Sequence, residues 1–252
     1  MIEILVLSLI QGITEFIPIS SSSHLIIMSD YLEFNEADLT IDVSLHIGSF
    51  VAVVTYFRKD LIDYIKNKKL FFKIIVSSIP IMIVGYLLVK LEIIYQLRNL
   101  EIIGWTTIIF GIFLFISDRF KIEKSIEKDF SLKSAIIIGL FQVLSLVPGV
   151  SRSGITISSS RLLNFSRYDS AKISFLLSIP TLAAVSFFGL KEIVDVGKLD
   201  FSFLNILSIF LSFIFSYITI KYFFKYIKKF SLNLFVIYRL ILGIIILIIA
   251  YL

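Results

Sequence analysis

Two short stretches of the sequence place polar and charged side chains inside otherwise apolar surroundings. The first contains Gln11 and Glu15, which are four residues apart and therefore share one face of a helix. A carboxylate inside a membrane segment is costly unless it is paired or hydrated, so it is a functional candidate. Glu15 can hold a divalent cation through a hard oxygen, and the Gln11 amide oxygen can assist. The alternative is that Glu15 lies near the outer interface and caps the following loop.

Four consecutive serines, at positions 20–23, precede His24. A serine run usually forms a flexible surface linker. This run lies between apolar helices, where its hydroxyls need partners. It can line a cavity, cap the next helix, supply a nucleophile or donate to a phosphate. His24 can act as a general base or as a nucleophile. An isolated buried histidine is more often structural, but Glu15 and the serines nearby favour a catalytic or binding role.

The second stretch, Pro148–Thr156, is the more specific of the two. Arg152 carries a planar guanidinium that suits phosphate and stays charged in any environment. The flanking hydroxyls and the backbone N–H groups of the next helix add donors, and the helix dipole favours an anion there. The alternative is that Arg152 pairs with Glu15 purely for structure. Together the two stretches hold the parts that phosphoryl transfer requires.

Asp42 and His46 form another pair that is four residues apart, at the start of the next apolar stretch. The pair either bounds the outer mouth of the site or simply lies at the membrane interface. The sequence favours neither interpretation over the other.

The elements that carry these residues belong to an integral membrane protein. Hydrophobic residues make up 58% of the 252 positions, charged residues only 17%, and the mean hydropathy is +0.96. Soluble domains are about 45–50% apolar and about 25% charged. The net charge of +5 does not indicate nucleic acid, because the Lys and Arg residues lie in loops between apolar runs. Cysteine is absent, which excludes disulfides, thiolate metal sites and a cysteine nucleophile.

The apolar stretches are long enough to predict six transmembrane helices. A bilayer core of about 30 Å needs about 20 apolar residues as helix. The six expected spans are Val43–Phe57, Phe71–Val89, Leu100–Ser117, Ala171–Leu190, Phe201–Ile220 and Leu234–Leu252. The first segment lacks the basic region and cleavage site of a signal peptide, so we take it as part of the mature chain.

Two further hydrophobic segments, Ile2–Ile27 and Ser134–Leu163, are interrupted by Pro, Gly and Ser. Non-helical backbone at membrane depth persists only where it is buried in protein or lines a cavity. Each segment is therefore predicted to be helix–loop–helix. The expected helices are Ile2–Phe16, His24–Leu32, Ser134–Leu146 and Arg152–Leu163.

The distribution of Lys and Arg predicts the topology. One set of loops carries 18 of these residues and the opposite set carries only 4, namely Lys90, Arg98, Lys191 and Lys198. Cytoplasmic loops are the basic ones, so both termini are expected outside. The first broken segment then enters and leaves from the outside and the second from the inside. Two such re-entrant hairpins can meet at the middle of the bilayer.

The two halves of the chain also resemble each other. The residues from Phe16 to Ser21 are similar to those from Leu146 to Ser151, and Phe72–Pro80 ends in Ser-Ile-Pro, as does Ile173–Pro180. We expect one all-α membrane domain over residues 1–252, with pseudo-repeats over about 1–117 and 118–252. Because each half has one broken segment and three spans, the second copy is inverted. Such folds place their site at the repeat interface near midplane.

The two stretches resemble the signatures of a known family. Residues 11–24, QGITEFIPISSSSH, and residues 148–154, PGVSRSG, resemble the two motifs of bacterial undecaprenyl-diphosphate phosphatase, the bacitracin-resistance family. The resemblance extends over the whole chain. It implies removal of the terminal phosphate from undecaprenyl diphosphate, which regenerates the lipid carrier for peptidoglycan precursors and underlies bacitracin resistance. It also implies a divalent cation, Mg²⁺ or Ca²⁺, and an active site that faces outward from the bacterial plasma membrane.

The resemblance also assigns roles. Glu15 and Gln11 would serve the metal and the diphosphate, and His24 would take part in catalysis. The residues expected to bind the phosphates are Ser20, Ser21, Ser151, Arg152, Ser153 and Thr156. The nucleophile stays open between Ser21, His24 and water. His24 is preferred as nucleophile or base, because a serine would itself need a base.

Two positions depart from the family pattern. Some members have Glu in place of Gln11, and a neutral residue weakens a site with two carboxylate ligands. The residue before His24 is usually Gly, whereas here it is Ser23. A serine costs about 1 kcal/mol or more if that position requires a positive φ.

The alternative function is a transporter or flippase for polyprenyl phosphate or an ion, because inverted repeats with paired broken segments are first of all a transporter plan. A scaffold without chemistry does not explain Glu15 and Arg152 at membrane depth. The expected partners are a polyprenyl diphosphate and membrane lipids, and no nucleic acid. A homodimer, the preferred metal and the prenyl chain length are left open by the sequence.

Overall fold

A computed structural model describes residues 1–252 except 22, 25–38, 67, 123 and 196–201. The described part is built from helices, as predicted, and contains no strand beyond an isolated bridge between Lys124 and Phe165. Its elements are α1 (Ile2–Thr14), α3 (Leu39–Tyr56), α4 (Arg58–Lys66), α5 (Lys68–Lys90), α6 (Ile93–Gln96), α7 (Leu100–Asp118), α8 (Ile126–Asp129), α9 (Leu132–Val143), η1 (Leu144–Leu146), α10 (Arg152–Leu162), α11 (Arg167–Asp195), α12 (Phe203–Ile227) and α13 (Asn233–Tyr251).

Five of the six expected spans are helices long and apolar enough to cross a membrane. They are α5, α7, α11, α12 and α13. The sixth expected span lies in α3, which is a shorter apolar helix. The protein is therefore a multi-pass membrane protein with at least these five candidate spans.

The helices follow the packing rules of a lipid environment. On α12 the buried positions include Ser208, Ser212 and Ser216, each 0% exposed, while the large apolar Phe210 and Ile218 face outward. Lipid is as apolar as these side chains, so burying them gains little, and small polar residues pack between helices instead.

Helix α12 packs closely against both α3 and α1. Ser49 of α3 shares hydrogen bonds with Ser212 at 3.2 Å and with Ser216 at 3.0 Å. A methyl group at Gly48 would collide with the carbonyl of Ile209, and one at Gly12 would lie 2.8 Å from the amide nitrogen of Ser216. Close approach at these glycines places α1, and with it the residues that follow, against α12.

Both interrupted segments have a helix followed by a loop, and the second is helix–loop–helix throughout. In the first, α1 ends at Thr14, residues 15–20 form a loop, and the chain is helical again at Ser21. The expected helix His24–Leu32 lies outside the described residues beyond His24. In the second, α9 and η1 lead into residues 147–151, after which α10 begins at Arg152. Residues 15–20 are called the first loop below, and residues 147–151 the second loop.

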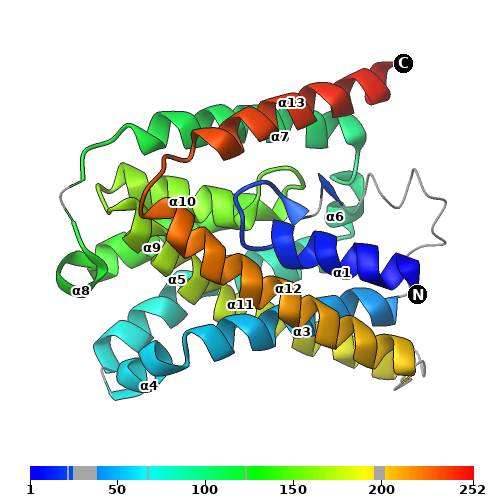
Figure 1. Cartoon of the computed structure of the whole chain (residues 1–252), viewed down its shortest axis with the longest axis horizontal. Helices are drawn as coiled ribbons and strands as arrows, with labels where there is room; N and C mark the ends of the chain where they lie inside the picture. The colour runs from blue at the N-terminus through cyan, green and yellow to red at the C-terminus, as the bar shows by residue number, and fades with distance from the viewer. Residues whose placement is uncertain (22, 25–38, 67, 123, 196–201) are drawn as a thin grey trace.

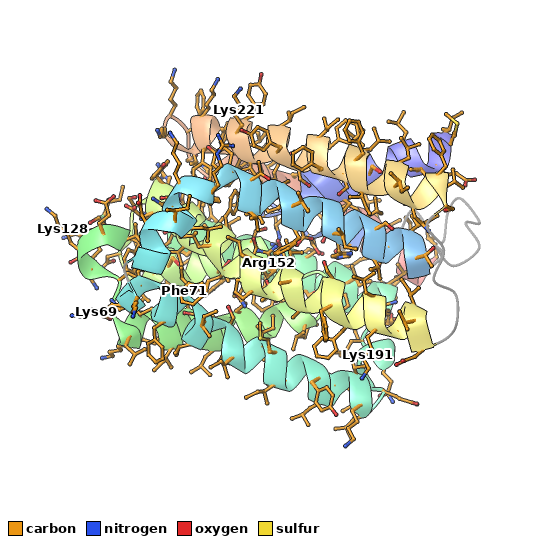
Figure 2. The ribbon with its side chains drawn as sticks, turned by 90° about the horizontal axis from the view of Figure 1, so that it is seen from below. Lys69, Phe71, Lys128, Arg152, Lys191 and Lys221 are labelled. Atoms are coloured by element: carbon orange, nitrogen blue, oxygen red, sulfur yellow. The ribbon has the colours of Figure 1, made fainter. Side chains whose placement is uncertain are left out.

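The two ends of the helix bundle differ in charge (Figure 2). Lys69 and Lys128 lie at one end, Lys191 lies at the other, and Arg152 lies between them. The N- and C-termini both lie at the end that carries Lys191 (Figures 1 and 2). This distribution agrees with the loops that the sequence assigns to opposite sides.

The helix contacts recur between the two halves of the chain. Helix α1 packs on α12 and α9 packs on α5, while α3 packs on α12 and α11 packs on α5. Two further contacts join α3 to α11 and α7 to α13. The shared Ser-Ile-Pro does not support the repeat, however. Pro80 lies in α5, the second long helix of its half, and Pro180 lies in α11, the first long helix of the other half.

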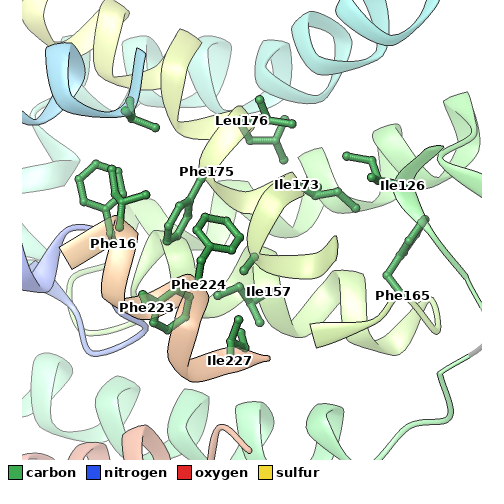
Figure 3. Close-up of a cluster of buried hydrophobic side chains, with 14 of the residues drawn as sticks. Phe16, Ile126, Ile157, Phe165, Ile173, Phe175, Leu176, Phe223, Phe224 and Ile227 are labelled. Carbon is green, nitrogen blue, oxygen red and sulfur yellow. The ribbon is translucent and has the colours of Figure 1, made fainter. Parts of the chain in front are cut away.

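An aromatic cluster anchors the first loop to the bundle (Figure 3). Phe16, which follows Glu15 directly, is 0% exposed and packs edge-on against Phe175 of α11 with ring centroids 5.3 Å apart. Phe223 and Phe224 of α12 contact the same ring at 5.5 and 5.2 Å. Such aromatic pairs add about 0.5–1.5 kcal/mol each beyond area burial. The cluster therefore fixes the backbone next to Glu15.

Candidate active site

The two loops meet through a contact between Glu15 and Arg152. Arg152 Nη2 donates to Glu15 Oε1 at 2.5 Å, and the two side chains are only 12% and 9% exposed. The residues are 137 positions apart in the sequence. Arg152 lies midway between the two ends of the bundle (Figure 2). The structure therefore brings together the carboxylate and the guanidinium that the sequence singled out.

The second oxygen of Glu15 gathers two further predicted residues. Glu15 Oε2 accepts hydrogen bonds from Gln11 Nε2 at 3.3 Å and from Ser21 Oγ at 3.1 Å. Gln11 is 0% exposed, and its Oε1 is buried without a hydrogen-bond partner in the described part of the chain. The helical spacing of Gln11 and Glu15 predicted their shared face, and the structure confirms it.

The first loop owes its shape to Ser20. This residue has a φ of +75°, a conformation that side chains other than Gly rarely adopt. Ser23 Oγ donates to Ser20 Oγ at 3.0 Å across the first turn of the following helix. Ser23 is itself helical, so the substitution of Ser for the usual Gly before His24 does not strain the backbone there. The strained position is three residues earlier.

The second loop is built in a related way. Gly149 and Ser151 have φ values of +90° and +69°. Ser151 caps α10, since its Oγ accepts from the amide of Gly154 at 3.2 Å. Ser153 Oγ donates to the carbonyl of Ile17 at 3.0 Å, which ties the second stretch directly to the first loop.

Thr156 links the backbone of Arg152 to α11. Its Oγ1 contacts Ser174 Oγ of α11 at 2.7 Å and the Arg152 carbonyl at 2.8 Å, and the residue is 0% exposed. Arg152 Nη1 donates to the Ser174 carbonyl at 3.4 Å. A serine in the middle of a long apolar helix gave no specific signal, so sequence reasoning missed Ser174.

His24 is held by Ser20 and Tyr238. Its Nδ1 lies 2.6 Å from the Ser20 carbonyl and its Nε2 lies 2.5 Å from the Tyr238 hydroxyl, with the two rings stacked. A carbonyl only accepts, so Nδ1 carries the proton, and in neutral imidazole Nε2 accepts from Tyr238. Neither of these hydrogen bonds is to Glu15 or Arg152. Tyr238 was not predicted from the sequence.

The second histidine pairs with Asp42 within α3. His46 Nδ1 contacts the Asp42 carbonyl at 2.9 Å and its carboxylate at 3.7 Å. Both contacts are within one turn of the same helix, so they favour neither interpretation of this pair over the other.

Two other buried arginines are used differently. Arg161, at the far end of α10, donates to the carbonyls of Asp118, Phe120 and Phe165 and lies 3.5 Å from the Asp118 carboxylate. Arg167 binds the same carboxylate at 2.7 Å. These contacts connect α7, α10 and α11 at the basic end of the bundle.

The other buried arginine is Arg239 of α13. It is 0% exposed and contacts both loops, and it was not predicted from the sequence.

Taken together, the arrangement suits a phosphate anion. Arg152 offers a charged donor, Ser151 opens α10 with a helix N-terminus, and Ser21 presents a hydroxyl to a carboxylate. The side chains of Arg152 and Glu15 are only 12% and 9% exposed, which strengthens their electrostatic interactions relative to water.

Comparison with known proteins gives a consistent result. The profile of the family described as "Bacitracin resistance protein BacA" matches residues 4–245. A protein named undecaprenyl-diphosphatase from Pelagibacter ubique is 52% identical over 251 residues, covering 99% of this chain and 98% of the relative. Proteins of the same name from Teredinibacter turnerae and Jannaschia sp. are 39% and 37% identical, with 97% of each chain covered.

Proposed function

The chain belongs to the bacitracin resistance protein BacA family and hydrolyses undecaprenyl diphosphate, and we propose that the first and second loops form the active site. The observation that carries this proposal is the buried Glu15–Arg152 contact with Ser21 and Gln11 around it. Release of the terminal phosphate recycles the lipid carrier for cell-wall synthesis. The alternative of transport without hydrolysis is not favoured, because the relatives carry the name of a hydrolase.

Arg152 and the hydroxyls of the second stretch bind the diphosphate. The guanidinium neutralises charge on the nonbridging oxygens, and charge that develops in the transition state is stabilised by donors already in place. Ser151 and Ser153 hold the start of α10 in position. Ser20 keeps the first loop in the conformation that presents Ser21, and Thr156 keeps Arg152 in place.

Ser21 is the nucleophile in this proposal and Glu15 is its base. Their hydrogen bond of 3.1 Å supplies the base that a serine needs. Glu15 takes the hydroxyl proton, Ser21 Oγ bonds to the terminal phosphorus, and the lipid monophosphate leaves with the electron pair of the broken bond. Water then attacks the phosphoserine, which frees phosphate and returns a proton to Ser21. This assignment departs from the sequence-based preference for His24, whose ring nitrogens are engaged by Ser20 and Tyr238.

A divalent cation fits beside Glu15. Gln11 Oε1 is a buried oxygen without a partner among the described residues, so a hard ligand is free there. The described part of the chain holds no cluster of three His, Cys, Asp or Glu residues. Mg²⁺ often needs only one or two carboxylates when substrate phosphates and waters complete its shell. Glu15 and Gln11 are the proposed protein ligands, and the cation, when bound, neutralises phosphate charge.

The proposed topology has six spans and two re-entrant hairpins in an inverted repeat. The recurrence of the helix contacts supports it, since exchanging the halves turns the α1–α12 contact into α9–α5 and the α3–α12 contact into α11–α5. The excess of Lys and Arg at one end supports placing that end in the cytoplasm. The active site then opens outward.

The test is phosphate release from a polyprenyl diphosphate by purified protein with Mg²⁺. We expect turnover by the wild type and a loss of at least about 1,000-fold in Ser21→Ala, as for other serine nucleophiles. Ser231→Ala, at the basic end of the bundle, serves as the matched control and keeps full activity. Substrate labelled on the terminal phosphate is used with two parallel quenches, one in acid, which preserves phosphoserine, and one in alkaline denaturant, which preserves phosphohistidine. We expect acid-stable label on the protein only while Ser21 is present.

The outcomes separate the candidates. A trapped phosphate that persists in Ser21→Ala and disappears in His24→Gln identifies His24 as the nucleophile. Turnover without any trapped phosphate indicates direct attack by water. A wild type that binds the lipid but releases no phosphate contradicts the function itself.

A further inference from the structure

We propose that Arg239 of α13 is a positioning residue that holds both loops in register for catalysis, an inference that rests on the active site proposed above. Its guanidinium donates to the carbonyls of Gly149 at 2.8 Å and Val150 at 3.1 Å in the second loop. It also lies 3.5 Å from the carbonyl of Pro18 in the first loop. A single side chain from the last helix therefore contacts both loops.

The same guanidinium is anchored on its other side by α7. Arg239 Nε donates to the carbonyl of Thr107 at 3.2 Å, and the residue is 0% exposed. Among the residues that the structure describes, all of its hydrogen-bond partners are backbone carbonyls and none is a carboxylate. A buried charge costs several kcal/mol unless it is compensated, so these carbonyl contacts are tightly specified. Because three of the four carbonyls belong to the two loops, Arg239 connects α13 to the loops as well as to α7.

The surrounding backbone leaves space for the guanidinium. A methyl group on Gly154, in the first turn of α10, would lie 2.8 Å from Arg239 Nη1. One on Gly111 of α7 would lie 3.2 Å from Arg239 Cβ. Glycine at these two positions lets the arginine pass between α7 and α10 to reach the loops.

The position of the contacts explains how Arg239 acts on the reacting groups. Gly149 and Val150 are the two residues before Ser151, whose hydroxyl caps the helix that Arg152 begins. Pro18 lies between Glu15 and Ser21. Because a peptide bond is planar and trans, fixing a carbonyl also fixes the N–H on its other side. Arg239 thereby fixes the two peptide planes that lead into Ser151, directly before Arg152, and the plane between Pro18 and Ile19 in the loop that joins Glu15 to Ser21.

Lysine cannot replace this contact set. Arg has five N–H donors in a flat fork, whereas Lys has one ammonium at the end of a flexible chain. An ammonium has three donors on a single atom and cannot reach all four carbonyls, which lie on α7 and on both loops, so at least one of these contacts is lost. A misplacement of about 1 Å far from the chemistry can cost about 100-fold in rate.

The first experiment compares Arg239→Lys with Arg161→Lys, a matched control. Arg161 is also almost fully buried, at 1% exposure, and also donates to three backbone carbonyls, but at the basic end of the bundle. We expect kcat per folded molecule to fall by about 100-fold in Arg239→Lys. In Arg161→Lys we expect less folded protein with an unchanged kcat. An unchanged kcat in folded Arg239→Lys, or an equal fall in both variants, overturns the inference.

A second variant serves if Arg239→Lys does not fold. Gly111→Ala leaves Arg239 in place and puts a methyl group 3.2 Å from its Cβ and 3.6 Å from its Nε, while alanine suits helix α7. We expect it to displace the guanidinium, to lower kcat and to keep the protein folded. A Gly111→Ala protein with wild-type kcat contradicts the proposal.

A readout without turnover probes the second loop directly. The chain has no cysteine, and Val150 is 1% exposed, so Val150→Cys places a single buried thiol in the second loop. We expect slow maleimide labelling in the Arg239 protein and fast labelling after Arg239→Lys. Equal labelling rates show that Arg239 does not hold the loop. These results are independent of the proposed function, which fails separately if the wild type releases no phosphate.

Discussion

Two arginines stand apart from every other basic residue in the chain. Of the 24 Lys and Arg residues, 22 lie in or next to the loops that set the topology. The other two are Arg152 and Arg239, and both contact the loops of the proposed active site. A charge inside a membrane segment is rare and usually functional. That rule applies to both residues. Arg152 was predicted because Pro, Gly and Ser surround it, whereas Arg239 lies in an uninterrupted apolar run and was not predicted.

At the residue scale, the Glu15–Arg152 pair is open to a structural interpretation that a double substitution can test. Removing one partner of a buried ion pair costs about 3–5 kcal/mol, whereas replacing both with neutral residues is often tolerated. We expect Glu15→Gln combined with Arg152→Gln to unfold near the wild-type temperature, well above either single variant. We expect the double variant to release no phosphate, because the base and the phosphate ligand are both gone. Thermal unfolding in detergent and phosphate release measure the two properties.

The result separates the two roles of the pair. Arg98→Ala, in an exposed position on the opposite set of loops, is the control for a lost arginine and keeps both stability and activity. If the double variant is stable and still active, the pair is purely structural and the reacting groups lie elsewhere.

How much of the site the sequence could predict depends on the distance between partners along the chain. The contact of Gln11 with Glu15 follows from helical spacing, and Arg152 was identified from its surroundings. The contact between Glu15 and Arg152 was considered only as a structural alternative. Tyr238 could not be found, because a tyrosine in an apolar helix is unremarkable and its contact with His24 joins residues 214 positions apart.

At the scale of elements, the residues of the proposed site lie in or next to the loops that interrupt the two hydrophobic segments. Each loop contains a proline and leads into a helix through a serine with positive φ, Ser20 in the first and Ser151 in the second. One residue separates the proline from the serine in the first loop, whereas two residues, Gly149 and Val150, separate them in the second. The sequence predicted both breaks because Pro and Gly interrupt helices for steric reasons. It did not predict which serine would be strained, since that depends on hydrogen bonds formed only in the folded chain.

The conformation of Gly149 leads to a stability prediction. Its φ is +90°, and a methyl group would collide with Thr106 Oγ1 and lie 2.7 Å from the Ile103 carbonyl. Thr106 also donates to the carbonyl of Pro148 at 2.6 Å, so it cannot move freely. We expect Gly149→Ala to lower the free energy of unfolding by more than about 1–2 kcal/mol, the cost of a left-handed conformation alone. Thermal unfolding in detergent measures this change.

Gly85→Ala is the matched control. Gly85 lies in α5 with an ordinary φ, and a methyl group there would meet only Leu146 Cδ2 at 3.4 Å. Alanine is the better helix former, so stability is expected to stay level or to rise. Similar losses in both variants would show that the second loop is not specially constrained.

At the scale of the whole molecule, the sequence predicted the positions of the long helices more securely than their arrangement. Hydropathy predicted each of the five candidate spans in the described part of the chain, because lipid requires long apolar segments with internal backbone hydrogen bonds. The repeat was harder to read, since one of the two short matches compares α5 with α11, which occupy different places. The helix contacts show instead which helices of the two halves correspond, because the packing of helices is retained where their side chains diverge.

The proposed orientation can be tested with single cysteines, because the natural chain has none. Lys128 and Lys191 are both exposed and lie at opposite ends of the bundle (Figure 2). Lys128 belongs to a strongly basic loop, and basic loops stay in the cytoplasm. In bacterial spheroplasts we expect a membrane-impermeant maleimide to label Lys191→Cys at once and Lys128→Cys only after permeabilisation. Labelling of Lys128→Cys in intact spheroplasts, with Lys191→Cys protected, would invert the molecule and turn its active site toward the cytoplasm. Phosphate release by both variants confirms that each labelled protein is the native fold, and labelling at both positions before permeabilisation would rule out a single orientation.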